Sequence, residues 1–180
     1  MSSVLRISGL ALVLSLTSGG AFGQNDPSPR IEAHQIDSEI AIDGRLDEEA
    51  WSRADAATGF RQFEPTEGDP ATQDTEVRIL YGPEAVYVGA MMHDENPSRI
   101  MATLGRRDQY NRADWLTVSF DSNNNQETAY TFAVNAAGIQ LDGLRSGSGG
   151  FGPPVDVSWD AVWESAVHVT SEGWTAEMRI

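Results

Sequence analysis

Apolar and polar residues alternate with a period of two along most of the chain, a pattern typical of half-buried β-strands. Two pairs of these segments are separated only by short turns, so each pair predicts a β-hairpin. We expect strands at residues 31–36, 39–42, 76–81, 86–92, 114–121, 128–135, 139–144, 161–169 and 174–180.

The alternation also predicts which side chains face the core. In residues 114–121 the apolar face carries Leu116, Val118 and Phe120, so Trp115 must point the other way. Trp163 and Trp174 fall on apolar faces, and we expect both in the core.

Helical signals are few and short. Asp47 suits a helix N-cap, and residues 48–51 suit one or two helical turns in which Trp51 plugs one end of the fold. Another helical turn is expected within residues 97–104. Residues 146–154 are rich in Gly, Ser and Pro and predict a flexible loop.

Many short alternating strands with little helix predict an all-β protein. We expect an antiparallel β-sandwich of immunoglobulin-like or jelly-roll-like form, with one or two short helices. The chain stops at Ile180 inside an expected strand, so we expect that the C-terminal strands of the domain are missing.

The N-terminal residues predict export. One positive charge is followed by about ten mostly apolar residues, half of what a spanning helix needs, and then by the small-residue site Ala21-Phe22-Gly23. The expected location is the periplasm, the outer membrane or the exterior. We therefore expect a signal peptide at residues 1–23, a linker at 24–30 and a single domain at 31–180.

Composition narrows the classes of function. The chain has 12 basic and 27 acidic residues, a net charge of −15, and no basic patch interleaved with aromatic residues, which argues against binding nucleic acid. It has no cysteine, which excludes disulfides, thiolate metal sites and a cysteine nucleophile.

Five segments together are distinctive, and the sequence resembles the family 9 carbohydrate-binding module. The resemblance is greatest to the version that precedes an outer-membrane barrel-like region in larger bacterial envelope proteins. It implies a non-catalytic β-sandwich that binds polysaccharide, in a family often attached to enzymes that hydrolyse O-glycosyl bonds. The segments are residues 42–51, 86–90, 114–121, 158–163 and 173–180.

The sugar-binding residues of that family carry over poorly. The resemblance implies a sugar clamped between two Trp and held by a Glu and an Arg. Asn111 stands at the first Trp position, Thr117 at the Glu position and Ala133 at the Arg position, while the second Trp would lie beyond Ile180.

The outward face that carries Trp115 offers a separate candidate site. An indole above small polar side chains suits the C–H face of a pyranose, and neighbouring polar groups suit its hydroxyls. The alternatives are that a loop covers Trp115 as ordinary packing and that the charged residues upstream of it form a solvated loop. The candidate ligand-binding residues are Trp115, Asn135, Arg107, Asp108, Arg112 and Trp159.

Metal and catalytic signals are weaker. Asp121, Asn123 and Asn125 resemble the start of a calcium loop, but Gln126 and Phe132 replace its glycine and its bidentate glutamate, so a hairpin turn is the favoured interpretation. We therefore expect no cofactor, with Ca²⁺ as the alternative. The three histidines, His34, His93 and His168, are scattered, and no nucleophile motif occurs, so the chain itself is not expected to be an enzyme.

The sequence therefore predicts a non-catalytic carbohydrate-binding module of an exported protein. The alternative is a structural or interaction domain that precedes an outer-membrane barrel and binds no sugar. A glycoside hydrolase partner domain in the intact protein is a third possibility, by analogy.

Overall fold

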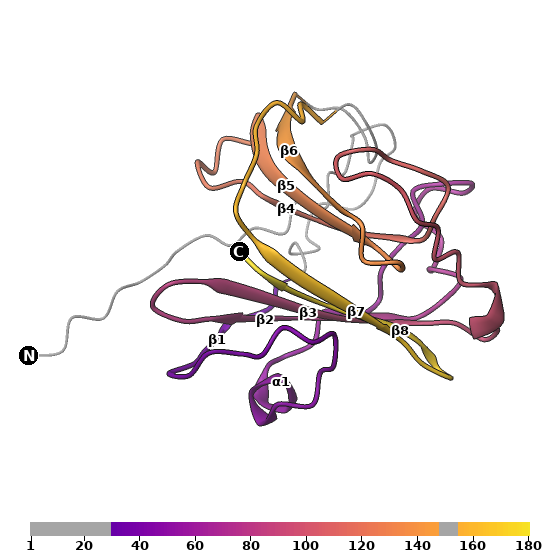
Figure 1. Ribbon diagram of the computed structural model, residues 1–180, viewed down its shortest axis with the longest axis horizontal. Coiled ribbons are helices and arrows are strands. Elements are labelled where there is room, and N and C mark those ends of the chain that lie inside the picture. The colour runs from indigo at the N-terminus through magenta and orange to yellow at the C-terminus, as the bar shows by residue number, and fades with distance from the viewer. Residues whose placement is uncertain (1–29, 148–154) are drawn as a thin grey trace, which may run out of the picture.

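The computed structural model describes residues 30–147 and 155–180, which form two β-sheets packed face to face (Figure 1). The larger sheet has the order β1 (His34–Gln35), β2 (Thr75–Tyr81), β3 (Val86–His93), β8 (Gly173–Arg179) and β7 (Glu164–Val169). The smaller sheet has the order β4 (Trp115–Phe120), β5 (Thr128–Asn135) and β6 (Gln140–Ser146). This confirms the predicted β-sandwich, in which β1 alone pairs with its neighbour in parallel.

Both predicted hairpins form, while the N-terminal elements differ from expectation. Residues 39–42 are not a strand, and the predicted strand at 31–36 is reduced to His34–Gln35. Ile36 and Ile40 still pack on one side, into one buried cluster, but only His34 and Gln35 pair with a neighbouring strand.

Both helical elements form, the first shifted by one residue and the second shorter than predicted. Helix α1 spans Glu49–Arg53 after an extended Glu48, so the N-cap lies one residue later than Asp47 and has no side-chain cap. The 3₁₀-helix η1 spans Pro97–Arg99 and ends five residues before Leu104. The chain after it is held instead by hydrogen bonds to other segments, which are described below.

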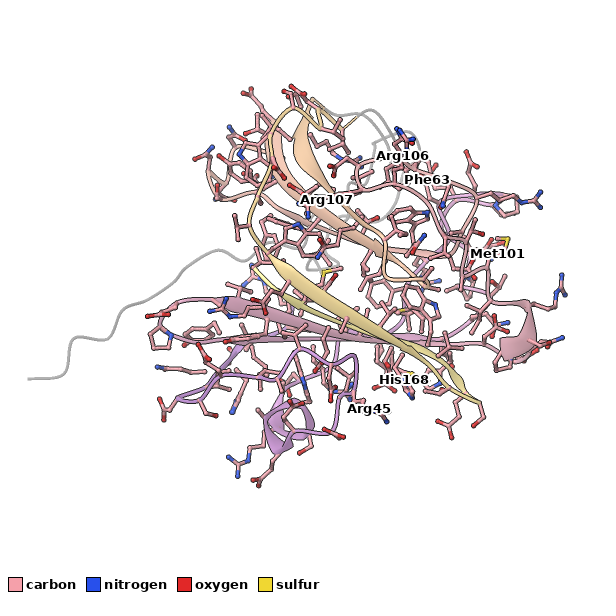
Figure 2. The ribbon with its side chains drawn as sticks, viewed as in Figure 1. Arg45, Phe63, Met101, Arg106, Arg107 and His168 are labelled. Atoms are coloured by element: carbon pink, nitrogen blue, oxygen red, sulfur yellow. The ribbon has the colours of Figure 1, made fainter. Side chains whose placement is uncertain are left out.

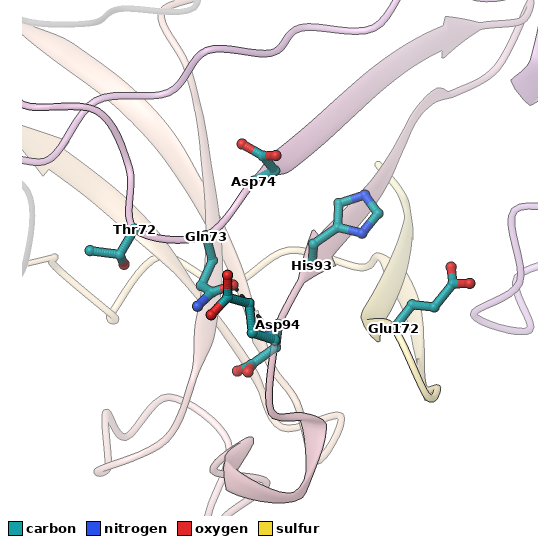
Figure 3. A pocket seen from close by; sticks show the side chains of 7 residues that line it. Thr72, Gln73, Asp74, His93, Asp94 and Glu172 are labelled. Atoms are coloured by element: carbon teal, nitrogen blue, oxygen red, sulfur yellow. Dashed lines mark hydrogen bonds between the residues drawn. The ribbon is translucent and has the colours of Figure 1, made fainter.

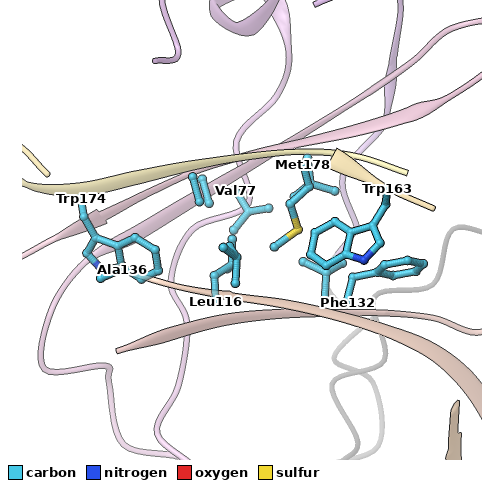
Figure 4. Close-up of a cluster of buried hydrophobic side chains, with 12 residues drawn as sticks. Val77, Leu116, Phe132, Ala136, Trp163, Trp174 and Met178 are labelled. Atoms are coloured by element: carbon cyan, nitrogen blue, oxygen red, sulfur yellow. The ribbon is translucent and has the colours of Figure 1, made fainter. Parts of the chain in front are cut away.

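The core lies between the two sheets, where the predicted apolar faces meet (Figure 4). Leu116 and Val118 of β4 face Trp174 and Met178 in this cluster, and Trp163 closes one end against Phe132 at a ring distance of 5.4 Å. The burial of Trp163 and Trp174 confirms their assignment to the core.

The five-stranded sheet also buries its other face. The segment that contains α1 lies beneath it in Figure 1, and Trp51 is 1% exposed there. Leu80 and Tyr87 of the sheet pack in the same cluster. The prediction that Trp51 plugs one end of the sandwich was wrong, because β2 and β3 present a second apolar surface that this tryptophan covers.

Two glycines allow the N-terminal segment to lie directly on the sheet. A Cβ on Gly89 would come within 2.8 Å of the Trp51 ring, and a Cβ on Gly44 would come within 2.7 Å of the Val167 backbone. Gly44 also has a φ of +85°, which side-chain-bearing residues rarely adopt. These contacts explain why residues 42–51 and 86–90 carry such a specific pattern.

A buried glutamate on β8 fastens this segment. The carboxylate of Glu177 accepts hydrogen bonds from the Asp43 and Gly44 N–H groups (3.0 and 2.8 Å) and from Trp51 Nε1 (2.9 Å). Burial raises the pKa of Glu177 above its usual range, although these three donors act in the opposite direction. We call this cluster the Glu177 lock.

Candidate functional site

The outer face of the three-stranded sheet carries the predicted site. Trp115 pairs with Asn135, Thr117 with Ala133 and Ser119 with Thr131, so the six side chains share the face opposite the core. The residues on β4 are half-buried, whereas those on β5 are fully buried. We call this surface the Trp115 face, and its exposed part is the edge formed by β4.

A loop of residues 101–113, which we call the cap loop, folds over one end of the Trp115 face. The Asp114 N–H donates to the Met101 carbonyl (3.1 Å), and the Met101 N–H donates to Asp114 Oδ2 (2.8 Å). The Thr103 hydroxyl donates to the Arg112 carbonyl (2.8 Å). The Asp108 N–H donates to the Gln140 carbonyl (3.1 Å). The cap loop therefore crosses the ends of β4, β5 and β6 as one ordered segment.

The indole of Trp115 is held by the cap loop on one side. Its Nε1 donates to the Asn111 carbonyl (3.2 Å), and its ring lies 4.9 Å from the Tyr110 ring at an interplanar angle of 59°. Trp115 remains half-buried and outside the inter-sheet core. The structure thus combines both alternatives from the sequence, because a loop packs on Trp115 and yet leaves part of it accessible.

The side chain of Asn135 holds the turn between β5 and β6. Its Oδ1 accepts the Ala137 and Ile139 N–H groups (3.0 and 2.9 Å), and its Nδ2 donates to the Thr103 carbonyl (2.9 Å). The residue is 0% exposed. In this structure its amide is engaged with the protein, and Asn135 presents no surface to a ligand.

Arg107 makes a clamp between the cap loop and the edge of the sandwich. Its Nη2 donates to Asp142 Oδ1 (2.6 Å) and to Asp160 Oδ1 (3.1 Å), and its Nη1 donates to Gln140 Oε1 (2.8 Å). Asp142 is 1% exposed and also accepts from Trp163 Nε1 (2.9 Å). No sequence pattern indicates these partners, because Asp142 lies on β6 far from Arg107 along the chain.

The other predicted charged residues of the cap loop behave differently. Asp108 is half-buried with a φ of +62°, and its Oδ1 accepts the Asp142 N–H (3.3 Å). Arg112 is exposed, as is Arg106. Neither of these two guanidinium groups has an ion pair or hydrogen bond with the residues that the structure describes.

Trp159 lies at a different place from Trp115. It is half-buried and packs on the core, with its ring 4.8 Å from Tyr130 and 5.9 Å from Phe132. These two residues are on the core side of β5, so the structure does not bring the two candidate stacking residues together.

The weak calcium candidate has the geometry of a hairpin turn. Asp121 is buried, and its carboxylate accepts the Asn125 and Gln126 N–H groups (3.2 and 2.7 Å). Asn123 is exposed, and the Asn125 side chain accepts the Glu127 N–H (2.9 Å). Among the described residues, no group of three His, Cys, Asp or Glu is placed to hold a metal ion.

Two hollows lie on the five-stranded sheet, away from Trp115. One of about 340 Å³ is rich in acidic side chains (Figure 3), including Asp74, Asp94 and Glu172. A second of about 540 Å³ brings together His93 and His168, which the sequence analysis treated as scattered. His93 Nε2 lies 3.8 Å from Glu76 Oε1, and neither hollow contains a nucleophile paired with a base.

The positions implied by the family resemblance do come together in space. Thr117 and Ala133 are partners across β4 and β5, and Asn111 touches Trp115 through its carbonyl. All three therefore lie on the Trp115 face or in the loop that caps it, although none has the residue type found in the sugar-binding member. No helix in the described part of the chain is long and apolar enough to span a membrane.

Comparison with known proteins places the fold. The chain is similar to two solved structures of a carbohydrate binding module family 9 from Caldicellulosiruptor kristjanssonii, one in complex with cellotriose and one with glucose. Identity is 15% in both; the matches cover 83% of this chain and 67% and 68% of those chains, with TM-scores of 0.53 and 0.55. No curated protein matches the sequence. The model of the carbohydrate family 9 binding domain-like family matches residues 42–180, and the chain belongs to that family, whose members are non-catalytic binding modules.

Proposed function

We propose that this domain binds a saccharide chain at the Trp115 face. The observation that carries the proposal is the half-buried indole of Trp115 outside the core, paired with the Tyr110 ring in a carbohydrate-binding fold. A buried tryptophan would serve packing alone, whereas a partly accessible one offers an apolar surface for a ligand.

The chemistry of the face suits a sugar ring. The indole offers a flat apolar surface to the C–H face of a pyranose, and the Thr117 and Ser119 hydroxyls stand on the same side of β4. Ser119 already shares a hydrogen bond with Thr131 (2.9 Å), so the Thr117 hydroxyl is the nearer candidate to meet a sugar hydroxyl.

The first ligands to test are cello-oligosaccharides, because the similar solved structures contain cellotriose and glucose. Isothermal titration of the purified chain should detect binding that Trp115→Ala weakens about tenfold or more, the order expected for a lost stacking contact. Trp115→Phe keeps a ring and should retain most of the affinity. Equal affinity of all three proteins would place binding elsewhere.

A second candidate function is an interaction domain that binds no sugar. It is favoured by Asn111, Thr117 and Ala133 at the positions where the family resemblance implies a Trp, a Glu and an Arg. An absence of binding to glucans, xylans and mannans would support it. Because the chain has no cysteine, Arg112→Cys would place a single thiol on the cap loop. Slower alkylation of this thiol in the intact protein than in the isolated chain would show that an interaction partner covers the Trp115 face.

We also propose that the domain is exported and belongs to a larger envelope protein. The support for export is the charge and hydropathy pattern of residues 1–23, and the support for the larger envelope protein is the resemblance of the five distinctive segments. Fractionation of expressing bacteria should find the chain outside the cytoplasm and shortened by 23 residues. A cytoplasmic chain that retains these residues would contradict this.

A further inference from the structure

Charge is distributed unevenly between the cap loop and the rest of the chain. Three arginines and one aspartate give residues 101–113 a net charge of +2, whereas the whole chain has a net charge of −15. The chain has 12 basic residues, so a quarter of them lie in these 13 positions. Arg107 is paired with Asp142 and Asp160, so Arg106 and Arg112 are the positive charges that the cap loop offers to an anion beside the half-buried Trp115.

Two of these arginines are free to meet a ligand. Arg106 and Arg112 are exposed and have no ion pair or hydrogen bond with described residues, whereas Arg107 is committed to Asp142 and Asp160. Both residues belong to the cap loop, so their guanidinium groups remain available to an anion on the loop that holds Trp115.

Both arginines follow cap-loop residues that lie at Asn111, whose carbonyl accepts the Trp115 indole N–H. Asn111 Nδ2 donates to the Thr103 and Leu104 carbonyls (3.1 and 3.3 Å), which joins the two sides of the cap loop next to Trp115. Arg106 follows Gly105, where a Cβ would come within 2.7 Å of Asn111 Nδ2, and Arg112 directly follows Asn111. Figure 2 shows Arg106 on the side of the three-stranded sheet, with Arg45 and His168 on the far side of the larger sheet.

We propose that the ligand of the Trp115 face is an acidic polysaccharide whose sugar rings carry carboxylates. The inference rests on the proposed function, since it names the class of saccharide that the same site binds. A sugar ring stacks on the indole, and its carboxylate, or that of the next sugar, pairs with the guanidinium groups of Arg106 and Arg112. The planar guanidinium matches a carboxylate with two parallel hydrogen bonds.

The decisive ligands are two forms of one polymer. Polygalacturonate and its highly methyl-esterified form share a backbone and differ in charge, so titration of the purified chain with each isolates the carboxylate. We expect polygalacturonate to bind roughly tenfold more tightly at low salt, and to lose this advantage as salt screens the contact. If repulsion by the net charge of −15 dominated instead, added salt would strengthen the binding of polygalacturonate, and this result would contradict the proposal.

The matched variants are Arg106→Gln with Arg112→Gln, and Arg45→Gln as the control. Arg45 is also exposed but lies on the opposite side of the molecule (Figure 2). The double variant should lose roughly three- to tenfold in affinity for polygalacturonate, the sum expected for two exposed ion pairs, and less than twofold for the esterified polymer. Arg45→Gln should bind both polymers as the parent chain does.

Two different failures are distinguishable. If a neutral cello-oligosaccharide binds in a Trp115-dependent manner while the two pectin forms bind equally, the acidic-ligand inference is overturned and the proposed function stands. If Trp115→Ala changes the binding of no saccharide, both are overturned. Binding of a sulfated polymer but not of polygalacturonate would also overturn the assignment to carboxylates.

Discussion

The two outer faces of this sandwich differ in how completely they are covered. The outer face of the five-stranded sheet is covered by residues 36–54, with Trp51 1% exposed and bonded to a buried carboxylate. The outer face of the three-stranded sheet carries Trp115, half-buried and bonded to a backbone carbonyl of a loop. One tryptophan is fixed by the protein on every side, whereas the other keeps part of its ring available.

The comparison shows why residue type alone does not identify a binding site. Both tryptophans stand in family motifs, and both donate their indole N–H to the protein. What differs is the cover, because a continuous apolar cluster seals one ring and a polar, positively charged loop borders the other. Substitutions on the first face should therefore change stability, and those on the second should change binding.

The largest effect is expected for Trp51→Ala. The change removes a fully buried ring and deprives Glu177 of one hydrogen-bond donor, so the free energy of unfolding should fall by about 3–5 kcal/mol. Urea denaturation followed by circular dichroism measures it. A loss below 1 kcal/mol would show that residues 36–54 contribute little to the fold.

Gly44→Ala should have the next largest effect. An alanine there needs an unfavourable positive φ and pushes its Cβ against the Val167 backbone, so we expect a loss of at least about 2 kcal/mol. The same urea assay applies. Gly68→Ala is a matched control, since Gly68 also has positive φ but a Cβ there meets nothing within 4 Å.

Arg107→Gln and Arg106→Gln should separate a structural arginine from a free one. Loss of the Arg107 clamp leaves Asp142 buried without its charge partner and should cost about 1–2 kcal/mol, a value reduced because Arg107 is 41% exposed. Arg106→Gln should leave stability unchanged within about 0.5 kcal/mol. Equal melting temperatures for the two variants would contradict the clamp.

The Glu177 lock should show itself in the pH dependence of stability. Because burial raises the pKa of Glu177, its contribution is fully present below the unfolded-state pKa of about 4.5 and is lost as pH rises through the folded-state value. The stability of the parent chain relative to Glu177→Gln should therefore fall as pH rises above about 4.5. A difference that grows with pH would mean that the three hydrogen bonds outweigh burial.

Among the tryptophan substitutions, the smaller effect on stability is expected for Trp115→Ala. The residue lies outside the core, so unfolding should change by no more than about 1 kcal/mol even where saccharide binding is lost. Thermal denaturation in the absence of ligand measures it. A destabilisation similar to that of Trp51→Ala would erase the contrast between the two faces.

Much of the sandwich could be predicted from the sequence, because strands that bury one face alternate strictly. The inward positions of Leu116 and Val118 and the burial of Trp174 follow directly from this period. The doubly covered sheet was missed, although a signal existed. Ile79-Leu80 and Tyr87-Val88 are consecutive apolar pairs, which indicate strands that are buried on both faces.

The candidate site was predictable in part. Period two places Trp115 on the outer face, but no local pattern shows which groups an amide or a guanidinium will meet. The sequence predicts ligand-binding roles for Asn135 and Arg107, but Asn135 bonds to the Ile139 N–H and Arg107 to Asp142, so both side chains hold the fold together. Such pairings depend on how the cap loop crosses three strands, which is a property of the tertiary fold.

The Arg107 clamp has a consequence for how the cap loop moves. A loop without regular secondary structure would ordinarily exchange its amide hydrogens by small local openings. Here the Asp108 N–H is bonded to the end of β6, and the neighbouring guanidinium is bonded to a carboxylate that also holds the Trp163 indole. Opening the cap loop therefore leaves the buried Asp142 carboxylate without its charge partner. We expect the loop to open only when the sandwich unfolds, so that it presents Arg106 and Arg112 from a rigid backbone.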